Sequence, residues 1–153
     1  MESSLEVVQK LSECFGRDIY HNGRLNRGLL SSRVFGKSDK IVLLNSIVHP
    51  VVRFDFYRWS ESLNEEICFV ESAILYESRF DELVDEVWTV TAPEELRIGR
   101  VRQRSGLTEE EIKKRMAAQL SEEEKQRRAA HIIWNDGNVS VIHRVLSLLK
   151  SLE

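Results

Sequence analysis

The stretch from residue 92 to residue 137 constrains this chain most, because it places basic helical segments between two short apolar strands. The first predicted strand, Val87–Val90, leads to Pro93, and a first helical turn tolerates proline because its missing N–H would find no partner there. A second apolar run, His131–Trp134, is followed by an Asn-Asp-Gly turn that ends at Gly137. The order of patterns predicts a strand, two basic helices, a short helix and a second strand.

Capping residues mark the helix ends within this stretch. Gly106 follows the first predicted helix and is expected to end it. Thr108, with Glu111 three residues later, has the pattern of a capping box, and Ser121 with Glu124 repeats that pattern. These signals divide the connection between the two strands into three separate helices.

The predicted helices carry arginines that are suited to bind phosphate. The first helix carries Arg97, Arg100, Arg102 and Arg104, and the second carries Lys113, Lys114 and Arg115. A guanidinium group matches phosphate oxygens with two parallel hydrogen bonds, so helices held between two strands predict a mobile clamp on phosphate. An ordinary alternative stays open, because glutamates alternate with these arginines and solvated pairs, such as Glu111 with Arg115, would account for them.

Outside this stretch, the patterns indicate an α/β chain. A long helix is expected from Ser38 to about Leu63, and because Pro50 falls inside it, a kink or a break is expected near His49. Its wide buried apolar stripe is expected to consist of Ile41, Leu44, Ile47, Val48, Val51 and Val52. The run Ile67–Leu75 is apolar and rich in β-branched residues, which predicts a buried strand covered on both faces. A final helix is expected over residues 140–152. Strands separated by helices predict a parallel sheet with helices on both faces.

Composition limits the classes of function. A length of 153 residues favours a single domain over 1–153, and the net charge of −3 argues against a general nucleic-acid binder. No apolar run reaches the length of a membrane span and no secretory signal is seen at the N-terminus, so a cytoplasmic protein without membrane partners is expected. Cys14 and Cys68 lack metal-ligand spacing; no metal site is predicted and both are expected to be buried.

The spacing of residues in the C-terminal half resembles that of the dephospho-coenzyme A kinase family, whose members catalyse the last step of coenzyme A synthesis. The matching positions there are Pro93, Arg100, Arg104, Arg115, Gln119, Lys125, Ala129, Asn135 and Gly137. The matching pieces upstream are Phe15-Gly16, Asn22-Gly23, His49-Pro50 and the segment 74–77. Ala130 stands where the family usually has aspartate, which removes any contact made by that side chain. The resemblance covers nearly the whole chain.

The resemblance implies a P-loop-kinase-like parallel sheet with a helical lid, here spanning residues 93–129 with its flanking helices. It also implies a reaction, the transfer of the γ-phosphoryl group of ATP to the ribose 3′-hydroxyl of dephospho-coenzyme A. ATP would enter as its magnesium complex, and both partners are small molecules. The oligomeric state stays open.

The resemblance assigns residues to three parts of a site. The lid over the triphosphate would hold Arg100, Arg104 and Arg115; the adenine side, Asn135 and Gly137; the acceptor cleft, His49, Glu71 and Glu77. Ordinary alternatives stay open for each set. The lid arginines could form a surface ladder with neighbouring glutamates, the Asn-Asp-Gly segment could be a simple turn, and a histidine beside a proline on an apolar helix is often a core residue.

Two parts of the family's machinery have no match among these residues. The family begins with a P-loop, G-x-x-x-x-G-K-[ST], and a second strand that brings an aspartate as the base. Gly36-Lys37-Ser38 resembles only the end of such a loop, because Ser31 stands at the first glycine position and a helix is predicted before it. We therefore expect an N-terminally truncated domain that lacks its first strands and catalytic residues and is inactive alone. A non-catalytic protein that binds coenzyme A or nucleotide, and another small-molecule kinase, stay open as alternatives.

Overall fold

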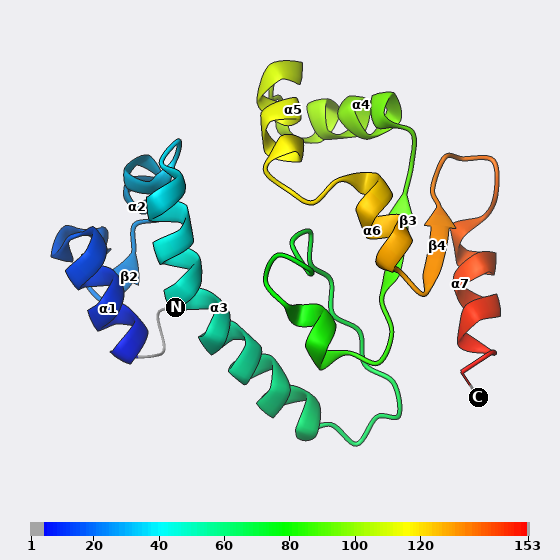
Figure 1. Cartoon of the computed structure of the whole chain (residues 1–153), viewed down its shortest axis with the longest axis horizontal. Coiled ribbons are helices and arrows are strands. Elements are labelled where there is room, and N and C mark those ends of the chain that lie inside the picture. Colours follow the sequence, from blue (N-terminus) through cyan, green and yellow to red (C-terminus); the bar gives the residue numbers. More distant parts are fainter. Residues whose placement is uncertain (1–4, 153) are drawn as a thin grey trace. The chain divides into compact units, whose positions relative to one another are not determined.

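The computed structural model describes residues 5–152, and the chain divides after Val70 into two compact units. The first unit consists of helices and a small hairpin, and the second contains the parallel sheet (Figure 1). The predicted single domain over residues 1–153 stays a prediction. Within the described part of the chain, none of the helices is both long enough and apolar enough to cross a membrane.

The first unit packs its helices around a hairpin. Asn22 and Gly23 have φ values of 49° and 74°, which lets the chain reverse within two residues between two short antiparallel strands. The elements are α1 (Leu5–Phe15), the 3-10 turn η1 (Arg17–Ile19), β1 (Tyr20–His21), β2 (Arg24–Leu25), α2 (Arg27–Val34) and α3 (Ser38–Glu61). The buried core consists of Val7, Leu11, Phe15, Ile19, Leu30 and Val34.

Helix α3 differs from its prediction in two ways. It continues through Pro50, so the expected break is wrong. Proline removes one hydrogen bond from the helix, and half-buried residues on both sides of it, Ile47 and Val51, pack against the core of the unit and hold the helix together. The predicted buried stripe is also wrong, because no residue of α3 is fully buried, and Ile41 and Val52 of that stripe are 42% and 43% exposed. Gly36 and Lys37 lie between α2 and α3, and Ser38 is the first residue of α3.

The second unit is built on two parallel strands that pair directly with each other. Strand β3 (Trp88–Thr91) pairs with β4 (His131–Trp134), with Trp88 opposite His131 and Thr91 opposite Trp134. The other elements are the 3-10 turn η2 (Phe80–Leu83), α4 (Glu94–Ser105), α5 (Glu109–Ala117), α6 (Glu122–Arg128) and α7 (Val141–Leu149). Helix α6 packs against β3 and α7 against β4 (Figure 1). The α/β class with a parallel sheet is confirmed.

The local signals in the connection between the strands are confirmed. Thr108 and Glu111 form a capping box at the start of α5, and the hydroxyl of Ser121 accepts a hydrogen bond from the Glu124 N–H at the start of α6. Gly106 ends α4 with a φ of 68°, a left-handed conformation that favours glycine. The strand-helix-helix-helix-strand order therefore follows from contacts between residues close in sequence.

The segment Ile67–Leu75 is not a strand, so this prediction is wrong. It forms loop and turn, and the Ile67 and Phe69 side chains are 42% and 62% exposed. A parallel strand needs a neighbouring strand for its N–H and C=O groups, and among the described residues β3 and β4 form a sheet only with each other. The burial predicted for the two cysteines is also wrong, since Cys14 and Cys68 are exposed.

Candidate functional site

Helix α4 carries three arginines on one face, and the first of them is fixed at the base of the helix. Arg97, Arg100 and Arg104 share a face because they are separated by three and four residues. The Nε of Arg97 donates to the Ala92 carbonyl oxygen at 3.0 Å, and its Nη1 donates to the Glu122 carboxylate at 3.0 Å. Arg97 thus connects the end of β3 and the start of α4 to α6.

Arg100 reaches the loop that follows β4. Its Nη1 donates to the backbone carbonyl oxygen of Asn135 at 2.8 Å. The N–H of Asn135 in turn donates to the carbonyl oxygen of Thr91, the last residue of β3, at 2.7 Å. The structure therefore brings together two residues predicted for the site, Arg100 from the lid and Asn135 from the adenine side, at the carboxyl ends of both strands.

The loop beyond Asn135 is shaped by Asp136 and Gly137. The Asp136 carboxylate accepts hydrogen bonds from the Asn138 N–H and from its side-chain amide, both at 2.9 Å. These bonds, first that of the backbone N–H, lower the pKa of Asp136, and the charge of Arg100 adds to the effect. Gly137 has a φ of 92°, and a side chain at this position would meet nothing within 4 Å. The loop therefore presents open backbone beside an ionised carboxylate.

The other two predicted lid arginines are exposed. Arg104, near the end of α4, has no recorded partner within residues 5–152. Arg115 lies on α5 and contributes only the least of the effects that shift the pKa of Glu111. The N–H of Thr108 is the main cause of that lowered pKa, because the Glu111 carboxylate closes the capping box at 2.9 Å. The alternative of a plain Glu111–Arg115 pair is weakened, since Glu111 already serves Thr108.

Glu77 holds the connection between α5 and α6. Its carboxylate accepts a hydrogen bond from the Leu120 N–H at 2.6 Å. Lys125 strengthens the same junction, because its Nζ donates to the Gln119 side-chain oxygen at 3.0 Å and to the Ala73 carbonyl oxygen at 3.3 Å. Sequence reasoning missed this role of Glu77. No local pattern could reveal it, because the two partners of the bond are 43 residues apart.

A charged cluster surrounds Tyr76 beside α6. The Glu124 carboxylate accepts hydrogen bonds from Arg127 at 2.7 and 2.6 Å and from Arg128 at 2.6 Å. The bonds from Arg127, followed by that from Arg128, lower the pKa of Glu124 from 4.5 to about 2. The Arg128 guanidinium lies 5.3 Å from the centre of the Tyr76 ring. Burial raises the pKa of Tyr76, whose hydroxyl finds no hydrogen-bond partner within the described chain.

The remaining predicted site residues are His49 and Glu71. His49 is half-buried on α3 in the first unit, where burial lowers its pKa. Glu71 is an exposed loop residue and makes no recorded contact with an arginine of α4 or α5 in the described chain, so its predicted place inside a buried strand is wrong. The predicted roles of these two residues in an acceptor cleft stay predictions.

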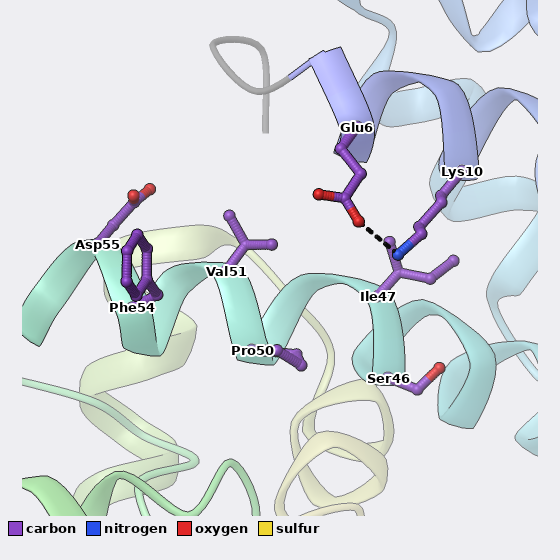
Figure 2. Close-up of a pocket in the computed structure, with 8 residues that line it drawn as sticks. All are labelled: Glu6, Lys10, Ser46, Ile47, Pro50, Val51, Phe54 and Asp55. Atoms are coloured by element: carbon purple, nitrogen blue, oxygen red, sulfur yellow. Dashed lines mark hydrogen bonds and ion pairs between the residues drawn. The ribbon is translucent and has the colours of Figure 1, made fainter.

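A cleft of about 640 Å³ lies in the first unit between α1 and α3 (Figure 2). It contains none of the predicted site residues, and its lysine, Lys10, forms an ion pair with Glu6 at 2.7 Å. Over residues 5–152, no group of three or more His, Cys, Asp or Glu side chains is arranged to hold a metal ion. The expectation that magnesium arrives with ATP stays a prediction.

Comparison with known proteins places these features in a family. The family model described as dephospho-CoA kinase matches residues 1–140. The dephospho-CoA kinase of Corynebacterium diphtheriae is 36% identical over 149 residues, covering 95% of this chain and 74% of the relative. That of Bacteroides fragilis is 37% identical over 147 residues, covering 95% of this chain and 72% of the relative.

Solved structures agree with the sequence comparison. The crystal structure of TT1252 from Thermus thermophilus matches with a TM-score of 0.80 and 32% identity, covering 94% of this chain and 74% of that one. The dephospho-CoA kinase from Campylobacter jejuni matches with a TM-score of 0.66 and 25% identity, covering 99% of this chain and 80% of that one. The similarity therefore extends over both units.

The Glu124 cluster leads to a prediction about acid stability. Since the pKa of Glu124 is lowered from 4.5 to about 2 on folding, its contribution to stability is complete above pH 4.5 and disappears as the pH falls towards 2. We expect Glu124→Gln to be less stable than wild type at pH 7, with the difference shrinking between pH 4.5 and pH 2. Urea unfolding at a series of pH values measures it. The neighbouring control Glu123→Gln should show no such pH-dependent loss, and an equal loss in both variants would contradict the assignment.

Proposed function

The chain belongs to the dephospho-CoA kinase family, and we propose that residues 92–137 form its ATP side, with α4 and α5 as the lid. In the proposed reaction the γ-phosphoryl group of ATP moves to the ribose 3′-hydroxyl of dephospho-coenzyme A. ATP enters as its magnesium complex, which supplies part of the charge compensation. The protein's share is to hold the nucleotide and to place cationic groups beside its phosphates.

One observation carries the proposal, the hydrogen bond at 2.8 Å from Arg100 to the Asn135 carbonyl oxygen. It shows that a cationic side chain of α4 reaches the loop at the carboxyl end of β4. In open α/β sheets, ligands bind at this edge of the strands. A nucleotide whose base lies against this loop would therefore have its phosphate tail within reach of the arginines of α4.

The partners of Arg100 suit it to bind phosphate. Its Nη1 donates to a neutral carbonyl oxygen and not to a carboxylate, and within residues 5–152 its charge is not cancelled by an ion pair. Exchanging this carbonyl for a phosphate oxygen replaces an ordinary hydrogen bond with a stronger, charge-assisted one. Arg104 and Arg115 would place further positive charge beside the negative charge that the transferred phosphoryl group carries.

On the adenine side, we propose that the Asn135 amide binds the edge of the base and that Gly137 lets the base approach the backbone. The open space at Gly137 supports this role. For the acceptor, we propose that His49 of the first unit and Glu71 of the second each take part in binding dephospho-coenzyme A. Glu77 would act there indirectly, because its carboxylate is bound to the Leu120 N–H and holds the base of the lid.

Binding of ATP should depend on Arg100. We expect Arg100→Gln to weaken the binding of ATP about ten-fold, because one charge-assisted hydrogen bond is lost. The affinity for adenosine should not change, because adenosine has no phosphate tail. Isothermal titration of both ligands measures this. Wild-type affinity for ATP is expected to be weak, on the order of 1 mM, since no P-loop is present among these residues to supply backbone N–H groups.

The matched control is Arg102→Gln, which removes the same charge from an exposed position of α4. This variant should bind ATP nearly as wild type does. An equal loss in both variants would mean that ATP responds only to the overall charge of α4. An affinity for ATP no better than that for adenosine in the wild type would remove the proposed ATP side altogether.

A turnover assay tests whether residues 1–153 alone transfer a phosphoryl group. We expect no ADP formation from ATP and dephospho-coenzyme A, because the sequence contains neither a complete G-x-x-x-x-G-K-[ST] motif nor an assigned base. Turnover at the usual rate for kinases, roughly 1–100 per second, would contradict this expectation. Titration with dephospho-coenzyme A in the same buffer shows whether the chain binds its acceptor without reacting.

Asp136 should oppose phosphate binding. It is ionised at neutral pH, since hydrogen bonds and the nearby charge of Arg100 lower its pKa, and its charge competes with a phosphate for the same guanidinium. We expect Asp136→Asn, which keeps an oxygen to accept from Asn138, to bind ATP roughly two- to five-fold more tightly at pH 7. Asp85→Asn, before the amino end of β3, is the control and should not tighten binding. Weaker binding by Asp136→Asn would contradict the competition.

A further inference from the structure

Arg97 differs from the other arginines on its face of α4 because two nitrogens of its guanidinium group donate to acceptors inside the protein. Its Nε donates to the Ala92 carbonyl oxygen, and its Nη1 donates to the Glu122 carboxylate, each at 3.0 Å. The pair is largely covered, with 29% of the Arg97 side chain and 20% of the Glu122 side chain exposed. Arg97 is therefore held in place and its charge is compensated.

The two bonds join three consecutive parts of the second unit. Ala92 directly follows β3, Arg97 is in the first turns of α4, and Glu122 is the first residue of α6. Helix α6 packs against β3, so Glu122 is anchored to the sheet independently of α4. A bond from Arg97 to Glu122 therefore fixes α4 relative to the sheet, close to the point where α4 leaves it.

The side chain at position 97 must reach in two directions at once. The guanidinium group is a rigid planar fork whose Nε and Nη1 serve different acceptors, whereas a lysine has a single nitrogen at the end of a flexible chain. Arg97 and Arg100 are three residues apart and lie on the same face of α4. Any rotation of α4 that loosens Arg97 would therefore also move Arg100 away from Asn135.

We propose that Arg97 is a positioning residue that acts through Glu122. The pair sets the direction of α4 so that Arg100 meets Asn135 and the phosphate tail of the nucleotide. The inference rests on the proposed function, which it deepens by giving the lid a fixed base. The other end of the α4–α5 segment has its own attachment, through Glu77 and the Leu120 N–H, so the Arg97 pair governs the α4 end.

A double-mutant cycle tests the proposal. The variants are Arg97→Gln, Glu122→Gln and the double variant, and the measured quantity is the ratio of the adenosine and ATP dissociation constants. We expect each single change to lower this ratio about five-fold, and the double change to lower it no further, because two residues that act through one another are not additive. Adenosine affinity should stay at the wild-type value, and Arg102→Gln should leave the ratio unchanged.

The outcomes separate the possible failures. An unchanged ratio in Arg97→Gln, with a cooperative thermal melt, would overturn the proposal and leave Arg97 with a stabilising role alone. Single effects that multiply in the double variant would also overturn it. If Arg97→Gln does not melt cooperatively, Glu122→Gln decides, because it leaves the bond from Arg97 to Ala92 in place. The proposed function itself is tested by Arg100→Gln, whose effect on ATP persists if only the role of Arg97 is wrong.

Discussion

The direct parallel pairing of β3 with β4 is the constraint on which the second unit depends. Parallel neighbours cannot be joined by a tight turn, so the chain must leave the end of β3 and return to the start of β4 through a long crossover. Helices α4, α5 and α6 form that crossover. The same pairing brings the two carboxyl ends together, where the Asn135 N–H donates to the Thr91 carbonyl oxygen at 2.7 Å. The contact between Arg100 and Asn135 is a consequence of this topology.

The arginines of α4 differ in their hydrogen-bond partners and in their exposure. Arg97 is bound to a carboxylate and largely covered, Arg100 is bound to a neutral carbonyl, and Arg104 is exposed. The cost of recruiting each guanidinium to a phosphate falls in this order, because breaking a covered ion pair costs more than exchanging a carbonyl. The base of α4 is therefore stable while its outer part keeps cationic groups that a ligand can bind.

The elements that sequence reasoning predicted correctly are those fixed by neighbouring residues. The capping box of Thr108 and the glycine end at Gly106 involve residues within one helical turn of each other, so a pattern reveals them. The strand predicted over Ile67–Leu75 was wrong because an apolar, β-branched run indicates only a tendency to form a strand. A strand forms only where a neighbouring strand pairs with its backbone N–H and C=O groups. The break predicted near Pro50 was also wrong, because packing keeps α3 helical on both sides of the proline.

The candidate site shows the same division. Arg100 and Asn135 could be predicted to share a site because their spacing resembles a family, and the structure brings them together. The hydrogen bonds from Arg97 to Glu122 and from the Leu120 N–H to Glu77 could not be predicted, since the partners are 25 and 43 residues apart in sequence. From the sequence alone, either carboxylate could equally well be a solvated surface group. Only the crossover brings each carboxylate to its partner.

Under the proposed function, the partner of Arg100 explains why the proposed lid can be ordered before a nucleotide binds and still bind one. If Arg100 faced a carboxylate, a phosphate would have to displace a charge of the same sign, and much of the gain would be lost in breaking that pair. The Asn135 carbonyl instead orients the guanidinium at 2.8 Å with a weaker acceptor. Asp136, a carboxylate that interacts electrostatically with Arg100, is partly engaged by two hydrogen bonds from Asn138. Under the proposed function, this arrangement orients the arginine for an anion without giving it a full counter-ion, which would favour release of the carbonyl when a phosphate binds.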